Sequence, residues 1–259
     1  MTQPASYRRI LSRMGYYNYQ NGLIYNHLNQ EGGWDDHLRH CRDIIIRMLD
    51  YFRPSRVTVL GSGWLLDVPL AEMVEQHREV YLVDIIHPPE VIRQAGELRN
   101  VNLVEQDITG GLIGGVWDLT VRLPFFRKLK TLDPISVPDY ETGFDPGFVI
   151  SLNILTQLES QIMSWLRKKV SPGEDAFTGF RKKIQEKHID FLRKHSSLLI
   201  SDYEEVVTGR RGETSASPTL LADVPRGLFR EEWMWNFDLK GRENYNSRIT
   251  IKELSIAWG

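Results

Sequence analysis

The sequence predicts an α/β protein built on an open, mostly parallel sheet with helices on both faces. Short apolar, β-branched runs such as RVTVL and EVYLVD alternate with segments of helical period. These runs are continuously apolar, as in a parallel sheet that is covered on both sides. The 259 residues are 41% hydrophobic and 25% charged, a composition that excludes collagen-like, low-complexity and mainly disordered proteins.

The elements follow in a regular order after an N-terminal cap. The first 40 residues mix aromatic and polar groups, and we interpret them as short helices. Apolar positions then recur at helical spacing from Trp34 onward, which predicts an amphipathic helix that ends before Pro54. Helices are also expected over 68–77, 155–170 and 175–195. The expected strands cover 56–60, 79–84, 101–107, 148–153 and 197–206, followed by a terminal antiparallel hairpin of 231–239 and 247–258. Residues 109–146 are rich in Pro and Gly and are expected to form a long irregular loop, of a kind that is usually functional or disordered.

Charge and cysteine content limit the class of partner. Lys and Arg number 32 against 34 Asp and Glu, a net charge of −2, so no global basic field attracts nucleic acid. The single cysteine, Cys41, excludes an internal disulfide and a multi-cysteine zinc site. No apolar h-region or 18-residue apolar run is present, and we therefore expect a cytoplasmic protein without a membrane partner. We expect a helical cap over 1–53 and a sheet domain over 54–259 that together form one compact unit; a homo-oligomer is compatible with the sequence.

Three features lie where successive predicted strands end, which is where open α/β sheets bind ligands. The turn Gly61, Ser62 and Gly63 follows the first strand, and glycines there permit positive φ and a close approach of backbone to ligand. Asp84 ends the second strand, where a carboxylate can accept both ribose hydroxyls of a nucleoside, although a turn or helix-capping aspartate has the same pattern. Asp107 ends the third strand, where it can accept from an adenine amine or form an Asx turn before Thr109.

On these residues the chain resembles a class I S-adenosylmethionine-dependent methyltransferase over about residues 55–205. The resemblance implies a Rossmann-like fold in which the glycine turn, Gly61 to Gly63, cradles the methionine part of S-adenosyl-L-methionine. It implies that Asp84 with its neighbour Ile85 holds the ribose, and that Asp107 with Ile108 meets the adenine. It also implies that VISLN at 149–153 faces the reacting centre, and the terminal hairpin suits this family.

The glycine turn departs from the family's pattern at two positions. The family has an acid, one residue, then Gly-x-Gly-x-Gly, whereas Val59 stands at the acidic position and Leu65 at the third glycine. Asp67 either supplies the missing negative charge or caps the following helix, and we favour the cap. A dinucleotide fingerprint would require glycine at position 66, where Leu66 stands.

Candidate catalytic residues come from three segments. Asn153 ends the fourth strand and either orients a ligand through its amide or caps the next helix. Tyr19 and His37 are candidates for an orienting phenol and a base. His37 and His40 are three residues apart, but we see no acid or cysteine pattern that completes a metal site, so no metal is expected.

These observations favour a methyltransferase that acts on a small molecule or natural product. Two alternatives stay open: an NAD(P)-dependent oxidoreductase, which shares the glycines and Asp84, and a non-catalytic protein that binds an adenosyl ligand. The run SLNIL replaces the Asn-Pro-Pro-Tyr type of motif expected for methylation of exocyclic amines in nucleic acid bases.

Overall fold

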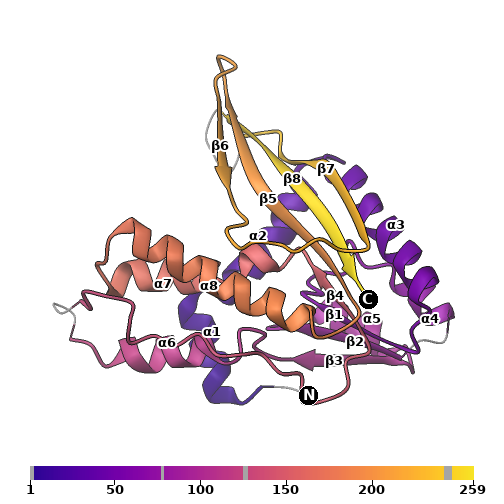
Figure 1. Cartoon of the computed structure of the whole chain (residues 1–259), viewed down its shortest axis with the longest axis horizontal. Coiled ribbons are helices and arrows are strands. Elements are labelled where there is room, and N and C mark those ends of the chain that lie inside the picture. The colour runs from indigo at the N-terminus through magenta and orange to yellow at the C-terminus, as the bar shows by residue number, and fades with distance from the viewer. Residues whose placement is uncertain (1–2, 77–78, 125–127, 242–246) are drawn as a thin grey trace.

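A single mixed sheet organises the computed structural model, which describes residues 3–76, 79–124, 128–241 and 247–259. The strand order is β3-β2-β1-β4-β5-β8-β7, with β6 paired to β5 off this path (Figure 1). The strands are β1 (Arg56–Leu60), β2 (Glu79–Asp84), β3 (Val101–Glu105), β4 (Phe148–Leu152), β5 (Ser197–Gly209), β6 (Thr214–Pro218), β7 (Phe229–Asp238) and β8 (Ser247–Trp258). The pairs among β1 to β5 are parallel, and β8 pairs antiparallel with both β5 and β7. The expected Rossmann-like sheet with its terminal antiparallel hairpin is confirmed.

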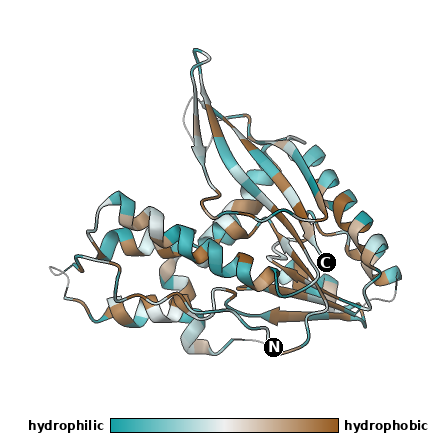
Figure 2. Ribbon diagram, viewed as in Figure 1, coloured by the Kyte–Doolittle hydropathy of each residue, from teal (hydrophilic) through white to brown (hydrophobic). Residues whose placement is uncertain are grey.

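Helices cover both faces of the sheet. One apolar layer packs α1 (Ala5–Met14), α6 (Leu112–Val121), α7 (Ser160–Lys169) and α8 (Glu174–Leu192) against the sheet. The other packs α3 (Asp35–Phe52), α4 (Leu70–Glu75) and α5 (Pro89–Gly96) against the opposite face. Between these layers β4 is buried at every residue, and Figure 2 shows the central strands as largely hydrophobic. This double coverage explains the continuous apolar strands in the sequence.

Three elements, α5, α6 and β6, were not expected from the sequence. Helix α6 lies within 109–146, which we had predicted to be irregular; it contains Gly114 and Gly115, and helix formation there depends on burial of Leu112, Ile113 and Val116. Strand β6 has no buried residue and pairs with the outer half of β5. There β5, β6 and β8 rise beyond the helical layers as an arm, and β7 runs alongside α3 (Figure 1).

The N-terminal helices cover one end of this arm. Helix α2 (Tyr16–Asn29) follows α1 at Gly15, and a short turn connects it to α3. Buried Gln30 donates from Nε2 to Asp238 Oδ1 at 3.0 Å and accepts from the Leu239 N–H at 3.0 Å. Trp34 Nε1 donates to the Phe237 carbonyl at 2.8 Å. These contacts attach the predicted cap to β7. The position of the cap therefore depends on the terminal hairpin.

None of the helices in the described part of the chain combines the length and apolarity needed to span a bilayer.

Gln30→Ala should lower the free energy of unfolding by about 1–3 kcal/mol, because it removes the side-chain donor to the buried Asp238 carboxylate and the side-chain acceptor of the Leu239 N–H. Urea unfolding of the variant measures the loss. Gln94→Ala, on the exposed side of α5, is the matched control and should change stability by less than about 0.5 kcal/mol. Equal effects of the two substitutions would contradict the attachment.

Candidate functional site

The carboxyl ends of β1 to β4 form the rim of a crevice at the point where the strand order reverses. Two adjoining pockets make up this crevice, and they share Gly61, Asp84, Ile85 and Ile154. We call the one that also contains Asp107 and Ile108 the β2–β3 pocket. We call the one that also contains Gly63, Asn153 and His37 the β1–β4 pocket. The predicted residues after four separate strands therefore meet in one continuous site.

The glycine turn is held against the end of β4. Gly61 has φ 81°, and its N–H donates to the Val83 carbonyl at 2.9 Å. A Cβ at this position would lie 2.6 Å from Ile154 Cβ and 2.9 Å from the Leu152 carbonyl oxygen, so only glycine fits. The side chain of Ser62 is fully buried and lines neither pocket. At this turn, therefore, it is Gly61 and Gly63 that border the crevice.

Asp84 connects the glycine turn to the end of β2. Its Oδ2 accepts from the Gly63 N–H at 2.7 Å and its Oδ1 from the Ile85 N–H at 2.7 Å. The residue is 7% exposed, and burial raises the pKa of the carboxyl, while the nearby His87 and the backbone donors oppose that rise. Because Asp84 borders both pockets, its carboxylate lies at the centre of the crevice.

Asp107 forms the Asx turn that was the alternative to adenine binding. Its Oδ1 accepts from the Thr109 N–H at 2.9 Å and from the Thr109 hydroxyl. Its Oδ2 accepts from the Tyr7 hydroxyl at 2.8 Å, so that α1 closes this end of the crevice. Burial raises the pKa of Asp107 and of Tyr7. Asp107 still lines the β2–β3 pocket, and its role toward adenine stays a prediction.

The glycine turn keeps a glycine-like backbone despite its departures from the family's pattern. Leu65, at the third glycine position, has φ 60°, a left-handed conformation that costs a non-glycine residue free energy. Its side chain is buried in the core beneath α3, which compensates this strain. Val59, at the acidic position, is fully buried within β1. The loop shape is thus retained without the usual acid.

Asp67 does not cap a helix, and the favoured interpretation is wrong. Helix α4 begins at Leu70 with Pro69 at its N-cap and no side-chain cap bond. The Oδ2 of Asp67 instead lies 2.8 Å from Asn153 Nδ2, and the residue lines the β1–β4 pocket. Burial raises the pKa of this carboxyl. Asp67 therefore brings a negative charge, or a proton, to the pocket that lacks the family's acid.

Asn153 also caps no helix, contrary to one of the two alternatives. It has φ 48°, and neither the short 3₁₀ helix η1 (Leu155–Gln157) nor α7 has a side-chain cap bond. Its amide lies in the β1–β4 pocket with Nδ2 3.2 Å from His37 Nε2. Its Oδ1 is buried and has no hydrogen-bond partner among the residues that the structure describes.

His37 is too well packed to serve as a base. It is 2% exposed and stacks on Trp235 with ring centroids 4.0 Å apart and planes 7° apart. Trp233 Nε1 donates to its Nδ1 at 3.2 Å. Burial, assisted by the positive charge that His40 can carry, lowers the pKa of His37 to about 3, and the ring is therefore neutral near neutral pH. The geometry assigns His37 a structural and orienting role in the pocket wall.

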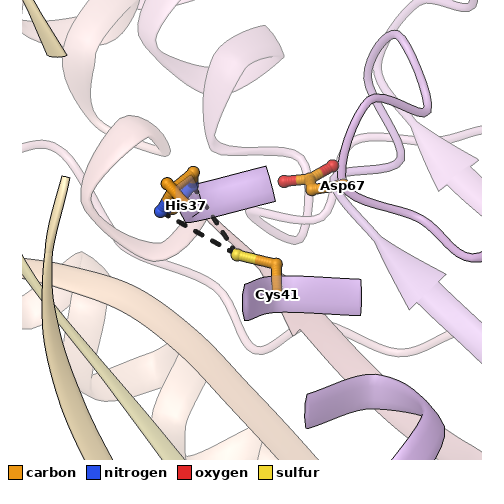
Figure 3. Close-up of side chains that lie close together, drawn as sticks. All are labelled: His37, Cys41 and Asp67. Atoms are coloured by element: carbon orange, nitrogen blue, oxygen red, sulfur yellow. Dashed lines mark hydrogen bonds between the residues drawn. The ribbon is translucent and has the colours of Figure 1, made fainter. Parts of the chain in front are cut away.

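The sequence analysis missed that His37, Cys41 and Asp67 come together. Their ligand atoms lie within 4.8 Å of one another (Figure 3). The four-residue spacing of His37 and Cys41, which places both on one face of a helix, was the available signal. The Asn153 Nδ2 lies among the three, 2.8 Å from Asp67 and 3.9 Å from Cys41 Sγ. The Trp233 donor also keeps the His37 proton on Nε2, so this nitrogen has no lone pair for a metal ion.

Helix α2 supplies the remaining polar wall. Tyr19 and Gln20 line the β1–β4 pocket, and Tyr16 lines both pockets. The Tyr16 hydroxyl is buried without a partner in the described residues, and burial raises its pKa well above the usual value. An orphaned buried hydroxyl is an available ligand contact. The lining of the two pockets includes Asp67, Asp84 and Asp107 but no Lys or Arg among the residues that the structure describes.

Comparison with known proteins gives only distant similarities. No family model and no curated protein matches this sequence. The solved structures include the 1,6-didemethyltoxoflavin-N1-methyltransferase of Burkholderia thailandensis with bound 1,6-didemethyltoxoflavin and S-adenosylhomocysteine. It is 13% identical, with a TM-score of 0.43, and the alignment covers 100% of this chain and 92% of that one.

Two further solved structures are similar to this chain at equally low sequence identity. The DhpI complex with SAH is 11% identical, with a TM-score of 0.32 and coverage of 96% of this chain and 97% of that one. The plantazolicin methyltransferase BpumL in complex with SAH is 10% identical, with a TM-score of 0.33 and coverage of 99% and 92%. At such identities and TM-scores we base the function on the residues of the crevice alone.

Gly61→Ala should lower the free energy of unfolding by roughly 1–3 kcal/mol or more, because the new Cβ meets Ile154 and the Leu152 carbonyl at a left-handed φ. Chemical denaturation measures the loss. Gly96→Ala is the control, since a Cβ there meets nothing within 4 Å and φ is not positive. A neutral Gly61→Ala would show that the turn is not clamped against β4.

Proposed function

We propose that the protein is an S-adenosylmethionine-dependent methyltransferase that acts on a small molecule. The observation that carries the proposal is the continuous crevice over β1 to β4, in which the Gly61 turn, Asp84 and Asp107 follow one another in the order of the sheet. An adenosyl ligand laid across these strand ends meets a carboxylate at the ribose and another at the adenine.

Charge favours this cofactor over a dinucleotide. S-adenosylmethionine carries an ammonium and a sulfonium group, and the acids that line the crevice, without a lining Lys or Arg in the described residues, match that charge. A pyrophosphate requires cations or a helix N-terminus next to the glycine turn. Helix α4 starts only at Leu70, after the loop that contains Leu65 and Asp67. These features weigh against the oxidoreductase alternative.

The residues of this chain can then be given roles. When bound, the cofactor supplies an electrophilic methyl group, so that the protein mainly aligns the acceptor and excludes water. Asp84 binds the ribose hydroxyls, and Asp67 takes over the ammonium contact that Val59 cannot make. His37, Trp235 and Trp34 form an aromatic wall for the acceptor in the β1–β4 pocket. Asn153 orients the cofactor or acceptor through its amide, and Tyr19 borders the same space.

The sequence supports a proposal for the location of the protein and for its partners. We infer a cytoplasmic protein that requires neither a metal nor a nucleic acid partner, on the charge balance and the single cysteine. A homo-oligomer is compatible with this function.

S-adenosylhomocysteine should bind the protein, and NADH should not, in isothermal titration calorimetry. Asp84→Asn should weaken binding of S-adenosylhomocysteine by about 1–3 kcal/mol, because a buried hydrogen-bonded carboxylate is lost. Asp118→Asn, an exposed acid on α6, is the matched control and should bind as the wild type does. Circular dichroism confirms that each variant is folded. Binding of NADH in preference to S-adenosylhomocysteine would overturn the proposal.

A further inference from the structure

Trp233 fixes which nitrogen of His37 carries the proton. The indole N–H only donates, and it points at His37 Nδ1 from 3.2 Å. Nδ1 must therefore accept, and the proton of the neutral ring resides on Nε2. The stack on Trp235 prevents the ring from turning away. His37 is consequently a donor toward the β1–β4 pocket.

The Nε2–H of His37 faces the amide of Asn153 at 3.2 Å and, farther away at 3.6 Å, the Sγ of Cys41, which is only a weak acceptor. The nearest amide atom, 3.2 Å away, is Nδ2, which would oppose one donor to another. Rotation of the amide by 180° exchanges its oxygen and nitrogen, which X-ray electron density also distinguishes poorly. With the amide oxygen in this position, Asn153 accepts a hydrogen bond from the Nε2–H of His37. Its Nδ2 then occupies the former position of Oδ1, which has no partner among the described residues.

The same amide position lies 2.8 Å from Asp67 Oδ2. An amide oxygen cannot donate, and two oxygens at this distance require a proton between them. Only the Asp67 carboxyl can carry it. The chain of donors from Trp233 through His37 to Asn153 therefore selects a protonated Asp67 in the ligand-free protein.

The groups that face Asp67 agree with this protonation. Cys41 and His37 approach from α3, and buried Glu253 approaches from β8, where neither of its carboxyl oxygens has a partner in the described residues. Burial, then the negative charge of Asp202 and that of Asp67 when it is ionised, raise the pKa of Glu253 well above its usual value. Arg42 opposes protonation of Asp67 with its positive charge, while its Nη1 donates to the Leu66 carbonyl at 2.7 Å. Asp84 is the further acid in the pocket.

We propose that Asp67 carries a proton in the empty crevice and releases it to solvent when the ammonium group of an adenosyl amino acid binds. The Asn153 amide then rotates and donates Nδ2–H to the new carboxylate. This inference rests on the proposed function, because the ammonium group is that of the cofactor. Trp233 and His37 are positioning residues in this exchange, and no covalent bond other than O–H changes.

The ligand-free half of the exchange can be tested by NMR. ¹⁵N shifts of the His37 ring should show the proton on Nε2, and ¹³C shifts should give the Asp67 carboxyl a pKa above its usual value. Trp233→Phe should lower that pKa, because a free Nδ1 lets His37 carry its proton there and accept from Asn153 through Nε2. Trp117→Phe, which removes an indole remote from the crevice, should leave both signals unchanged. A proton on Nδ1 of wild-type His37, or identical Asp67 titrations in wild type and Trp233→Phe, would overturn the inference.

The ligand-bound half can be tested by calorimetry with S-adenosylhomocysteine in buffers of different ionisation enthalpy. Binding should release up to one proton at pH values below the raised pKa of Asp67 and none well above it. The affinity should accordingly rise up to tenfold per pH unit until that pKa is passed, and then level off. Asp67→Asn should abolish the release, and Asp84→Asn should retain it.

The two proposals fail in different ways. Tight binding of S-adenosylhomocysteine without proton release at any pH from 5 to 8 would overturn the exchange and leave the cofactor assignment standing. Absence of binding to the folded wild type would overturn the proposed function together with the release step. The NMR titration would still decide whether Trp233 and His37 keep Asp67 protonated.

Discussion

The close approach of the glycine turn to the end of β4 is the constraint on which the site depends. No side chain fits at Gly61, where Ile154 and the Leu152 carbonyl occupy the space that a Cβ would need. This contact fixes the turn between the ends of β2 and β4, so that the Gly63 N–H reaches the Asp84 carboxylate. The same packing places Asn153 at the opposite wall of the crevice.

The electrostatics of the crevice follow from buried acids in a lining that has no Lys or Arg among the described residues. Burial raises the pKa of Asp67, Asp84 and Asp107, because a charge in a poorly hydrated site is costly. Backbone and hydroxyl donors offset this cost at Asp84 and Asp107. A cationic ligand offsets the remaining free-energy cost of the buried carboxylates. Such a site therefore favours cationic over anionic ligands.

The departures of the glycine turn from the methyltransferase pattern have structural compensations. Leu65 adopts the left-handed backbone that a glycine would have, and its burial in the core beneath α3 offsets the strain. Val59 contributes to the core, and Asp67 brings a carboxyl into the pocket from a later position in the loop. The turn thus has a left-handed backbone at Leu65 and a pocket-lining carboxyl at Asp67.

The sequence by itself determined every strand except β6, together with the glycine turn and the acids at the strand ends, since strand and turn signals are local in the chain. Helix α6 escaped detection because its glycines disfavour a helix that tertiary burial then stabilises. Only the tertiary structure decided that Asp67 and Asn153 face each other rather than cap helices, and that Trp233 orients His37. Those contacts join residues that are far apart in sequence, and their geometry depends on how layers pack, which no local pattern records.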